Sequence, residues 1–247
     1  MESNFRRIYA IPDVHGRLDL LDRALELMDS DGYDRNQDAL VFLGDLIDRG
    51  PDSKGVIDLV IALMKDSPNS VMAVRGNHED FPVNLYVHKL SWARKAWMYN
   101  GMIQTLESYD FSFPNDHLQF LLNRPYSIEI QGFFFSHAPV PCEAVMPEHK
   151  PGMPYSVEDL TWTYIDINTE LNKMHLHKGP RSNGGTGGEH LIGVCGHIHR
   201  GTDIKQVRIY PKYRMLDCGS GCFGSGKLAV HECISGRTLY ADPNDLK

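Results

Sequence analysis

Residues 39–50 read ALVFLGDLIDRG, in which a short apolar run, Ala39–Leu43, leads directly into a polar turn with two aspartates and an arginine. A run this short and apolar is typical of a strand that is buried on both faces. Helical spacing follows at Val56–Met64. The order strand, loop, helix predicts a βαβ unit whose functional groups lie on the loop at the carboxyl end of the strand.

The same order is found on both sides of this unit. Before it, the β-prone run Arg7–Pro12 precedes helical spacing at Leu18–Met28, and after it the run Val71–Val74 ends in a polar turn. Because successive βαβ units pair their strands in parallel, we expect a parallel sheet buried between helices.

The second half of the chain has a different pattern. Residues 84–124 are helical and polar-aromatic in character, and they predict a helical insertion that could cap the site. The runs Tyr126–Ile130 and Phe133–Ser136 flank Gln131-Gly132, a pair typical of a tight hairpin turn. Later short runs predict an antiparallel second sheet: Leu191–Cys195, Val207–Ile209, Tyr213–Leu216, Lys227–Cys233 and Thr238–Tyr240. We find no clear linker, so the sequence predicts one α/β domain over residues 1–247.

Composition narrows the classes of partner. The 247 residues carry a formal charge of −7, from 25 basic and 32 acidic side chains, which argues against nucleic acid as the main partner. No apolar run approaches the ~18–20 residues of a membrane helix, and no signal peptide is visible. The five cysteines are sparse and odd in number, which fits a reducing compartment. These features predict a cytoplasmic protein without a membrane partner.

Five short motifs rich in metal-ligand side chains follow the expected strands. They are Asp13-Val14-His15-Gly16, Gly44-Asp45-Leu46-Ile47-Asp48-Arg49-Gly50, Gly76-Asn77-His78-Glu79, Ser136-His137-Ala138 and Gly196-His197-Ile198-His199. Taken singly, each has an ordinary explanation, such as a helix N-cap for Asn77 or a core position for His137. Together they supply enough donors for two metal ions. A mixed oxygen and nitrogen set favours Mn, Fe or Zn over Mg or Ca alone.

The positions of these side chains suggest how the ions are held. Asp13 and His15 lie at i and i+2 past a strand end, and in extended backbone both would point toward one ion. The carboxylate of Asp45 can bridge two cations. Two ions ~3.5–4 Å apart would clamp phosphate oxygens and lower the pKa of a bridging water, whose hydroxide then attacks phosphorus in line.

Three further residues fit the rest of such a reaction. His78 follows Asn77 directly and could protonate the leaving alkoxide as a general acid. Asp48 could hold its ring and stabilise the imidazolium. Arg49 offers a planar fork for two phosphate oxygens.

With these motifs the chain resembles the calcineurin-like metallophosphoesterases. It resembles more closely their phosphoprotein phosphatase family, which includes the compact bacterial and lambda phage serine/threonine phosphatases. The five motifs carry the resemblance and span roughly residues 8–200. It implies an α/β/β/α sandwich, in which two packed mixed β-sheets are flanked by helices. It also implies two divalent cations, with Mn²⁺ favoured and Fe or Zn as alternatives.

The resemblance assigns a role to most motif residues. Asp13 and His15 would bind the first metal, Asp45 would bridge, Asn77, His137 and His197 would bind the second metal, His78 with Asp48 would supply the general acid, and Arg49 would bind phosphate.

The chain departs from the family pattern at two places. The last motif has a second histidine, His199, which in the wider superfamily joins the first metal, and we expect it to be an additional ligand. The family usually has another phosphate-binding arginine between the fourth and fifth motifs, which the lambda-like form places soon after a tryptophan, but none follows Trp162 closely. Arg181, in the glycine-rich stretch Lys178–Glu189, is the candidate substitute. We expect that stretch to be a mobile loop.

Three functions compete. The first is a phosphomonoesterase that acts on phosphoserine or phosphothreonine in proteins, or on small phosphoesters. The second is a symmetrical dinucleoside tetraphosphate hydrolase, which shares these motifs. Asp48 favours the first function, because the hydrolases usually have another residue before the arginine. The third is a non-catalytic metal-binding scaffold, and no ligand or acid residue has been lost as that function would predict.

Overall fold

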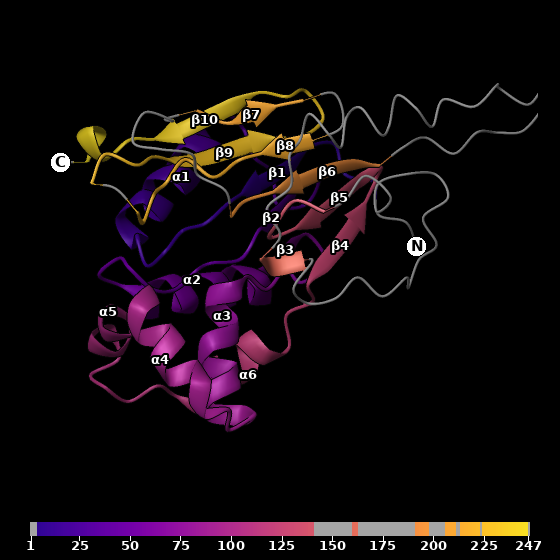
Figure 1. Cartoon of the computed structure of the whole chain (residues 1–247). Helices are drawn as coiled ribbons and strands as arrows, with labels where there is room; N and C mark the ends of the chain where they lie inside the picture. Colours follow the sequence, from indigo (N-terminus) through magenta and orange to yellow (C-terminus); the bar gives the residue numbers. More distant parts are fainter. Residues whose placement is uncertain are drawn as a thin grey trace, which may run out of the picture.

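A computed structural model describes residues 4–140, 160–162, 191–197, 206–210, 213–222 and 224–246. Its strands form two five-stranded sheets that pack against each other (Figure 1). The first sheet has the order β10-β9-β1-β2-β3. Its strands are β1 (Ile8–Ile11), β2 (Ala39–Phe42), β3 (Val71–Ala73), β9 (Leu228–Glu232) and β10 (Thr238–Ala241).

The first three strands are parallel, as the sequence predicts, and two long helices connect them. Helix α1 (Leu18–Ser30) buries Leu20, Leu21, Ala24 and Met28, which repeat at helical spacing. Helix α2 (Ser53–Asp66) begins after Asp52, whose carboxylate accepts a hydrogen bond from the Gly55 amide at 2.7 Å. Both helices therefore start just after the polar turns that end β1 and β2.

The second sheet has the order β4-β5-β6-β8-β7. Its strands are β4 (Ser127–Ile130), β5 (Phe133–Ser136), β6 (Ile192–Cys195), β7 (Arg208–Ile209) and β8 (Tyr213–Met215). The expected hairpin joins β4 and β5 through Gln131 and Gly132, whose φ angles of +46° and +83° suit a tight turn. The side chain of Gln131 also hydrogen-bonds the backbone of Phe5, which ties the hairpin to the start of β1.

The core has a separate cluster on each face of the first sheet. Tyr9 and Ile11 of β1 pack toward the helices, whereas Ile8 and Ala10 pack toward Phe133 and other residues of the second sheet. Because strand side chains alternate, burial of both faces requires an apolar residue at every position. This explains the continuous apolar runs in the sequence.

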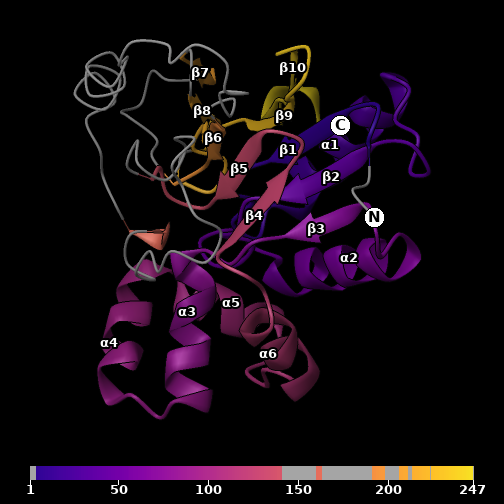
Figure 2. The same cartoon turned by 90° about the vertical axis from the view of Figure 1, so that its right-hand side faces the viewer.

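The region 84–124 is helical, as expected, and forms a group with the helix before it. The group contains α3 (Asn77–Pro82), the π-turn Val83–Val87, α4 (Ser91–Asn100), α5 (Met102–Ser108) and α6 (Asn115–Leu122). In both views it lies at the end of the molecule away from β9 and β10 (Figures 1 and 2). A short 3₁₀ turn, Pro243–Asp245, follows β10.

The structure confirms an α/β fold with two packed mixed sheets flanked by helices, but it corrects the predicted division of strands. The runs that contain β9 and β10 belong to the first sheet, because β9 pairs antiparallel with the free edge of β1. The second sheet is mixed rather than antiparallel, because β6 is parallel to both β5 and β8. Short apolar runs show that strands exist, but they do not show which edge each strand joins.

Candidate active site

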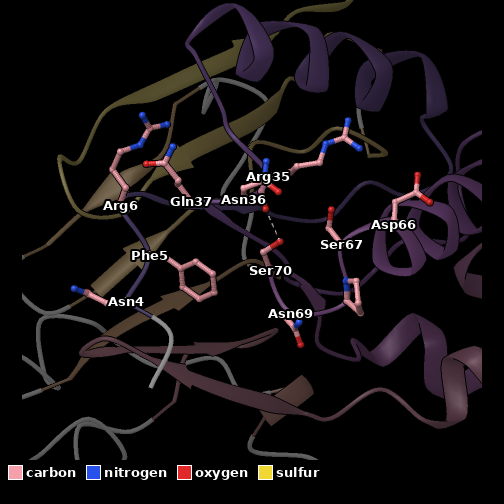
Figure 3. Close-up of a pocket in the computed structure, with 11 residues that line it drawn as sticks. Asn4, Phe5, Arg6, Arg35, Asn36, Gln37, Asp66, Ser67, Asn69 and Ser70 are labelled. Atoms are coloured by element: carbon pink, nitrogen blue, oxygen red, sulfur yellow. Dashed lines mark hydrogen bonds between the residues drawn. The ribbon is translucent and has the colours of Figure 1, made fainter. Parts of the chain in front are cut away.

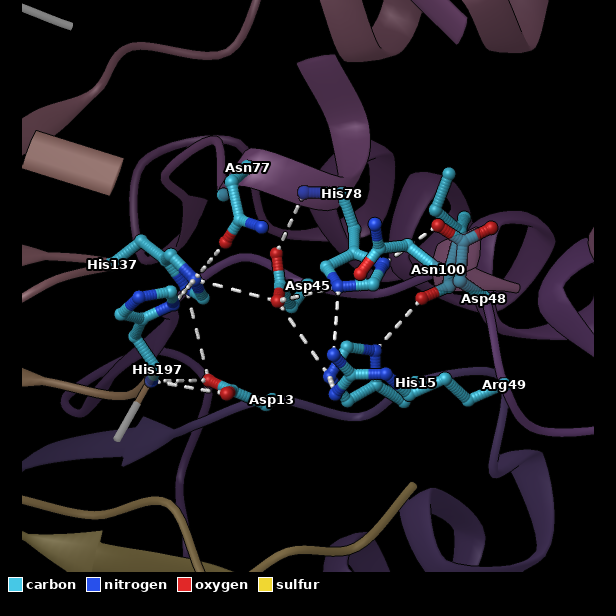
Figure 4. Close-up of polar contacts among 12 residues, drawn as sticks. Asp13, His15, Asp45, Asp48, Arg49, Asn77, His78, Asn100, His137 and His197 are labelled. Atoms are coloured by element: carbon cyan, nitrogen blue, oxygen red, sulfur yellow. Dashed lines mark hydrogen bonds and ion pairs between the residues drawn. The ribbon is translucent and has the colours of Figure 1, made fainter. Parts of the chain in front are cut away.

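The motif residues meet at the carboxyl ends of the strands. Asp13 and Asp45 follow β1 and β2, Asn77 opens α3 after β3, and His137 and His197 follow β5 and β6. Figure 4 shows these side chains directed toward one another from the two sheets. All five are buried, with at most 8% of any residue exposed. The two-sheet arrangement therefore gathers residues that are up to 184 positions apart in the sequence.

Asp45 lies at the centre of the cluster. Its Oδ2 atom is 3.6 Å from Nε2 of His15, 3.7 Å from Nε2 of His78 and 3.4 Å from Nε2 of His137. Two groups in the described part of the chain could each hold a metal ion, namely His15, Asp45 and His78, and Asp45, His137 and His197. Asp45 belongs to both groups, which is the arrangement that a bridging carboxylate needs.

Backbone carbonyls orient two of these histidines. The Nδ1 atom of His15 lies 3.0 Å from the Ile47 carbonyl oxygen, and Nδ1 of His137 lies 2.9 Å from that of Leu43. Each Nδ1 therefore carries the proton and donates it, which leaves the Nε2 lone pair directed at Asp45. Burial, and after it a neighbouring histidine ring, lowers the pKa of His15 and of His137 well below the usual value, which favours the neutral form that a metal ligand needs.

The carboxylates of the cluster are buried close to one another. Burial raises the pKa of Asp13 well above its usual value, and the neighbouring carboxylates of Asp217 and Asp45 add to the effect. Burial likewise raises the pKa of Asp45, with a further contribution from Glu79. A bound divalent cation would relieve this repulsion and hold the carboxylates ionised. The imidazole, carboxylate and amide donors fit borderline divalent metals.

The contacts of Asp13 differ from those of His15. Both of its carboxylate oxygens accept the backbone N–H of His197 at 3.0 Å, so it faces the second group, whereas the His15 ring faces Asp45 (Figure 4). The expectation of extended backbone is wrong at His15, whose φ is +49°. In the second group, Nε2 of His137 lies 2.9 Å from Oδ1 of Asn77 and 3.0 Å from Nδ1 of His197.

Asp48, His78 and Arg49 form a connected set that shares His78 with the first group. Oδ2 of Asp48 lies 2.6 Å from Nδ1 of His78. One guanidinium nitrogen of Arg49 lies 3.0 Å from Nε2 of His78, and the other lies 2.6 Å from Nε2 of His15. Burial and the Arg49 charge lower the pKa of His78, and burial raises the pKa of Asp48 to about 7. The set thus places a proton donor or acceptor next to an anion-binding fork.

Several residues that support the site were not identified from the sequence. The Glu79 carboxylate accepts hydrogen bonds from the backbone amides of Asp45, Leu46 and Gly76 at 2.7–2.8 Å. Glu79 belongs to a motif that we noted, so its position was a usable signal. Trp97 and Thr105, which hydrogen-bond Asp48, carry no such signal.

Two expected site residues, His199 and Arg181, lie outside the described residues, as does the stretch Lys178–Glu189. Trp162 is described, and its ring lies edge-on to His197 with centroids 6.1 Å apart. Trp162, after which the second arginine is absent from this sequence, therefore lies next to the site.

A groove elsewhere on the molecule lies away from the motif residues. This groove, of about 770 Å³, is lined by loops at the amino ends of β2 and β3, including Phe5, Arg6, Arg35 and Asn69 (Figure 3). None of the motif residues lines it. Neither of the two groups of metal-ligand side chains in the described residues lies in this groove. In the described part of the chain, no helix combines the length and apolar character needed to span a bilayer.

Comparison with known proteins places these observations in a family context. The model of the calcineurin-like phosphoesterase family matches residues 6–201. Serine/threonine-protein phosphatase 1 of Salmonella typhimurium is 38% identical over 99 residues, which cover 40% of this chain and 40% of that protein. A symmetrical bis(5'-nucleosyl)-tetraphosphatase of Legionella pneumophila is 42% identical over 99 residues, covering 40% of this chain and 31% of that protein.

These alignments thus span well under two thirds of either relative. Among solved structures, a candidate diadenosine tetraphosphatase superposes with a TM-score of 0.63 at 23% identity, covering 98% of this chain and 96% of that one. At that identity the similarity concerns the fold.

Proposed function

The chain belongs to the calcineurin-like phosphoesterase family, and on this premise we propose that it is a metal-dependent phosphomonoesterase that acts on phosphoserine or phosphothreonine in proteins. The observation that carries the proposal is the 2.6 Å contact between Asp48 and His78, with Arg49 beside it. A paired carboxylate and imidazole next to a guanidinium suit protonation of a leaving group on a bound phosphate.

In this proposal, Asp13, His15, Asp45, Asn77, His137 and His197 hold two divalent cations, with His199 as an additional ligand. Mn²⁺ fits the donor set, and Fe or Zn are the alternatives. When bound, the cations would supply Lewis acidity and a nucleophile active at neutral pH. The shared position of Asp45 in both ligand groups supports the role of bridge.

The remaining roles belong to protein side chains. Arg49 binds two phosphate oxygens through its planar fork. The dianion then lies next to Nε2 of His78 and favours the protonated ring, which gives its proton to the leaving oxygen. Asp48 accepts a hydrogen bond from the Nδ1–H group and keeps the ring in place. Arg181 supplies a second contact to phosphate, so Arg181→Ala should raise KM, and unchanged kinetics would remove it from the site.

A second candidate is symmetrical hydrolysis of dinucleoside tetraphosphates. The Legionella relative bears that name and is as similar over its aligned segment as the Salmonella phosphatase. Asp48 favours the phosphomonoesterase, because it supplies the partner that His78 needs as an acid.

A competition assay separates the two candidates. Mn-loaded protein receives a phosphothreonine peptide and diadenosine tetraphosphate in one tube, and the products are separated over time. Free phosphate from the peptide, with the dinucleotide intact, supports the phosphomonoesterase. If ADP forms first, the dinucleotide hydrolase is the better function. If the Mn-loaded protein turns over neither compound, the scaffold function replaces both.

We also propose that residues 1–247 act as one domain in a reducing compartment, the cytoplasm. The buried cysteines Cys195, Cys218 and Cys233 are free thiols. A single cooperative unfolding transition, unchanged by reductant, is the expected result. Two separate transitions would contradict the single domain.

A further inference from the structure

Asp48 has more hydrogen-bond partners than its contact with His78 requires. Its Oδ2 atom faces His78, and its Oδ1 atom accepts a hydrogen bond from Nε1 of Trp97 at 2.7 Å and another from Oγ1 of Thr105 at 2.6 Å. Its backbone N–H donates to Oγ of Ser53 and to Oγ1 of Thr105, and the nitrogen lies 3.0 Å from each oxygen. The two carboxylate oxygens therefore have separate tasks, because one faces His78 and the other is fixed by donors.

Both donors to Oδ1 come from the helical region, 49 and 57 positions after Asp48. Trp97 lies on α4 and Thr105 on α5, and both are fully buried. Gly101 joins the two helices with a φ of +117°, and a Cβ there would lie 2.5 Å from the Arg49 backbone nitrogen. The helix junction thus packs directly onto the backbone of residues 48 and 49.

That backbone is itself strained. Asp48 and Arg49 have φ angles of +75° and +67°, in the left-handed region that non-glycine residues rarely adopt. Such residues persist where the surrounding structure fixes them. The contacts from Ser53, Thr105 and Gly101 supply that support.

We propose that Trp97 and Thr105 are positioning residues for the general acid, which orient His78 by holding the second oxygen of Asp48. The inference rests on the proposed function, in which His78 protonates the leaving group. It gives the region 84–124 a task other than capping the site, because α4 and α5 hold Asp48 through hydrogen bonds to its second carboxylate oxygen. Without the two donors, the Asp48 carboxylate can rotate away from Nδ1 of His78, and the ring loses its fixed direction.

The test compares two substrates that differ in their need for an acid. The alkoxide of a phosphoserine peptide requires a proton to leave, whereas the nitrophenolate of p-nitrophenyl phosphate leaves without one. For Trp97→Phe and Thr105→Val we expect kcat on the phosphoserine peptide to fall roughly tenfold more than kcat on p-nitrophenyl phosphate. This is a part of the rate enhancement of about 10²–10⁴-fold that a general acid contributes. KM should change little, because neither side chain binds phosphate.

Matched variants separate positioning from general stability. Thr105→Ser keeps the hydroxyl and should restore the substrate ratio of the wild type. Trp92→Phe alters a tryptophan on the same helix that is 56% exposed, and it should leave the ratio unchanged. Equal losses on both substrates in Trp97→Phe and Thr105→Val would overturn the inference, because a structural defect lowers both alike.

A spectroscopic measurement keeps the test independent of turnover. In protein labelled with ¹⁵N-histidine, the Nδ1 proton of His78 should give a low-field signal because of its short hydrogen bond to Asp48. The signal should move upfield or broaden in Trp97→Phe and Thr105→Val, and stay unchanged in Trp92→Phe. If the wild type hydrolyses neither substrate, the proposed function fails, whereas an unchanged His78 signal in both variants would overturn the positioning role separately.

Discussion

Two neighbouring parts of the site are held in place by different parts of the chain. One is the ligand cluster around Asp45, and the other is the Asp48 set, which consists of Asp48, His78 and Arg49. In the ligand cluster, His15 and His137 are oriented by backbone carbonyls of residues 47 and 43, which lie around the end of β2. Asp48 is held by side chains of α4 and α5, about fifty positions later in the sequence. The first arrangement depends on the sheet, and the second depends on how a group of helices packs against it.

The largest expected effect comes from the residue that both ligand groups share. Asp45→Asn removes the negative charge between the two cations, so we expect loss of both ions and of turnover. Elemental analysis of the purified variant measures the metal content directly. A variant that retains two metals per chain would contradict the role of bridge and the distinction between the two regions.

The Asp48 set should fail in a different way. His78→Asn removes the acid but leaves the strand-end ligands, so metal content should be preserved while kcat falls about 10²–10⁴-fold. Steady-state kinetics with metal analysis on the same sample check both halves of this expectation. Unchanged turnover would exclude His78 as the acid, and loss of metal would place it among the ligands.

Glu79 tests how far the sheet side depends on one buried carboxylate. Glu79→Gln replaces an acceptor of three backbone N–H groups with an amide that also presents donors to them. We expect the free energy of unfolding to fall by about 1–3 kcal/mol. Urea unfolding measures the change, and Glu26→Gln, at an exposed position on α1, is the matched control. Equal stability of the two variants would show that the Glu79 contacts contribute nothing net.

The smallest effect is expected at the start of α2, which carries Ser53 into the Asp48 set. Asp52→Ala removes the N-cap contact to Gly55 and should lower stability by about 1 kcal/mol. Metal content should not change, because Asp52 does not contact the ligand cluster in the described structure. Thermal unfolding with metal analysis provides the measurement, and a loss of metal would show that the two regions are not independent.

The sequence predicted most of what depends on local order. Apolar runs followed by polar turns located the parallel strands, and the motif residues at their ends proved to be neighbours in space. The pairing of β9 with β1 was not predicted, because a strand pattern contains no information about which edge it joins. Trp97 and Thr105 were also missed as partners of Asp48, since an aromatic residue or a threonine on a helix is most often part of an ordinary core.

Backbone conformation at the site was a second feature that the sequence did not predict. Five of the nine non-glycine residues with positive φ in the described structure belong to the site: His15, Asp45, Asp48, Arg49 and His197. No side-chain pattern signals that a histidine or an aspartate will adopt the left-handed region. The i, i+2 argument for Asp13 and His15 assumed extended backbone, which His15 does not adopt.

The pairing of β1 with β9 also has a consequence during synthesis on the ribosome. The antiparallel partner of β1, Leu228–Glu232, is made some 220 residues after β1 itself. Until then one edge of β1 has no neighbouring strand, and an open apolar edge invites pairing with other chains. A nascent chain arrested before residue 228 should therefore aggregate or recruit chaperones, even though it already contains every motif residue.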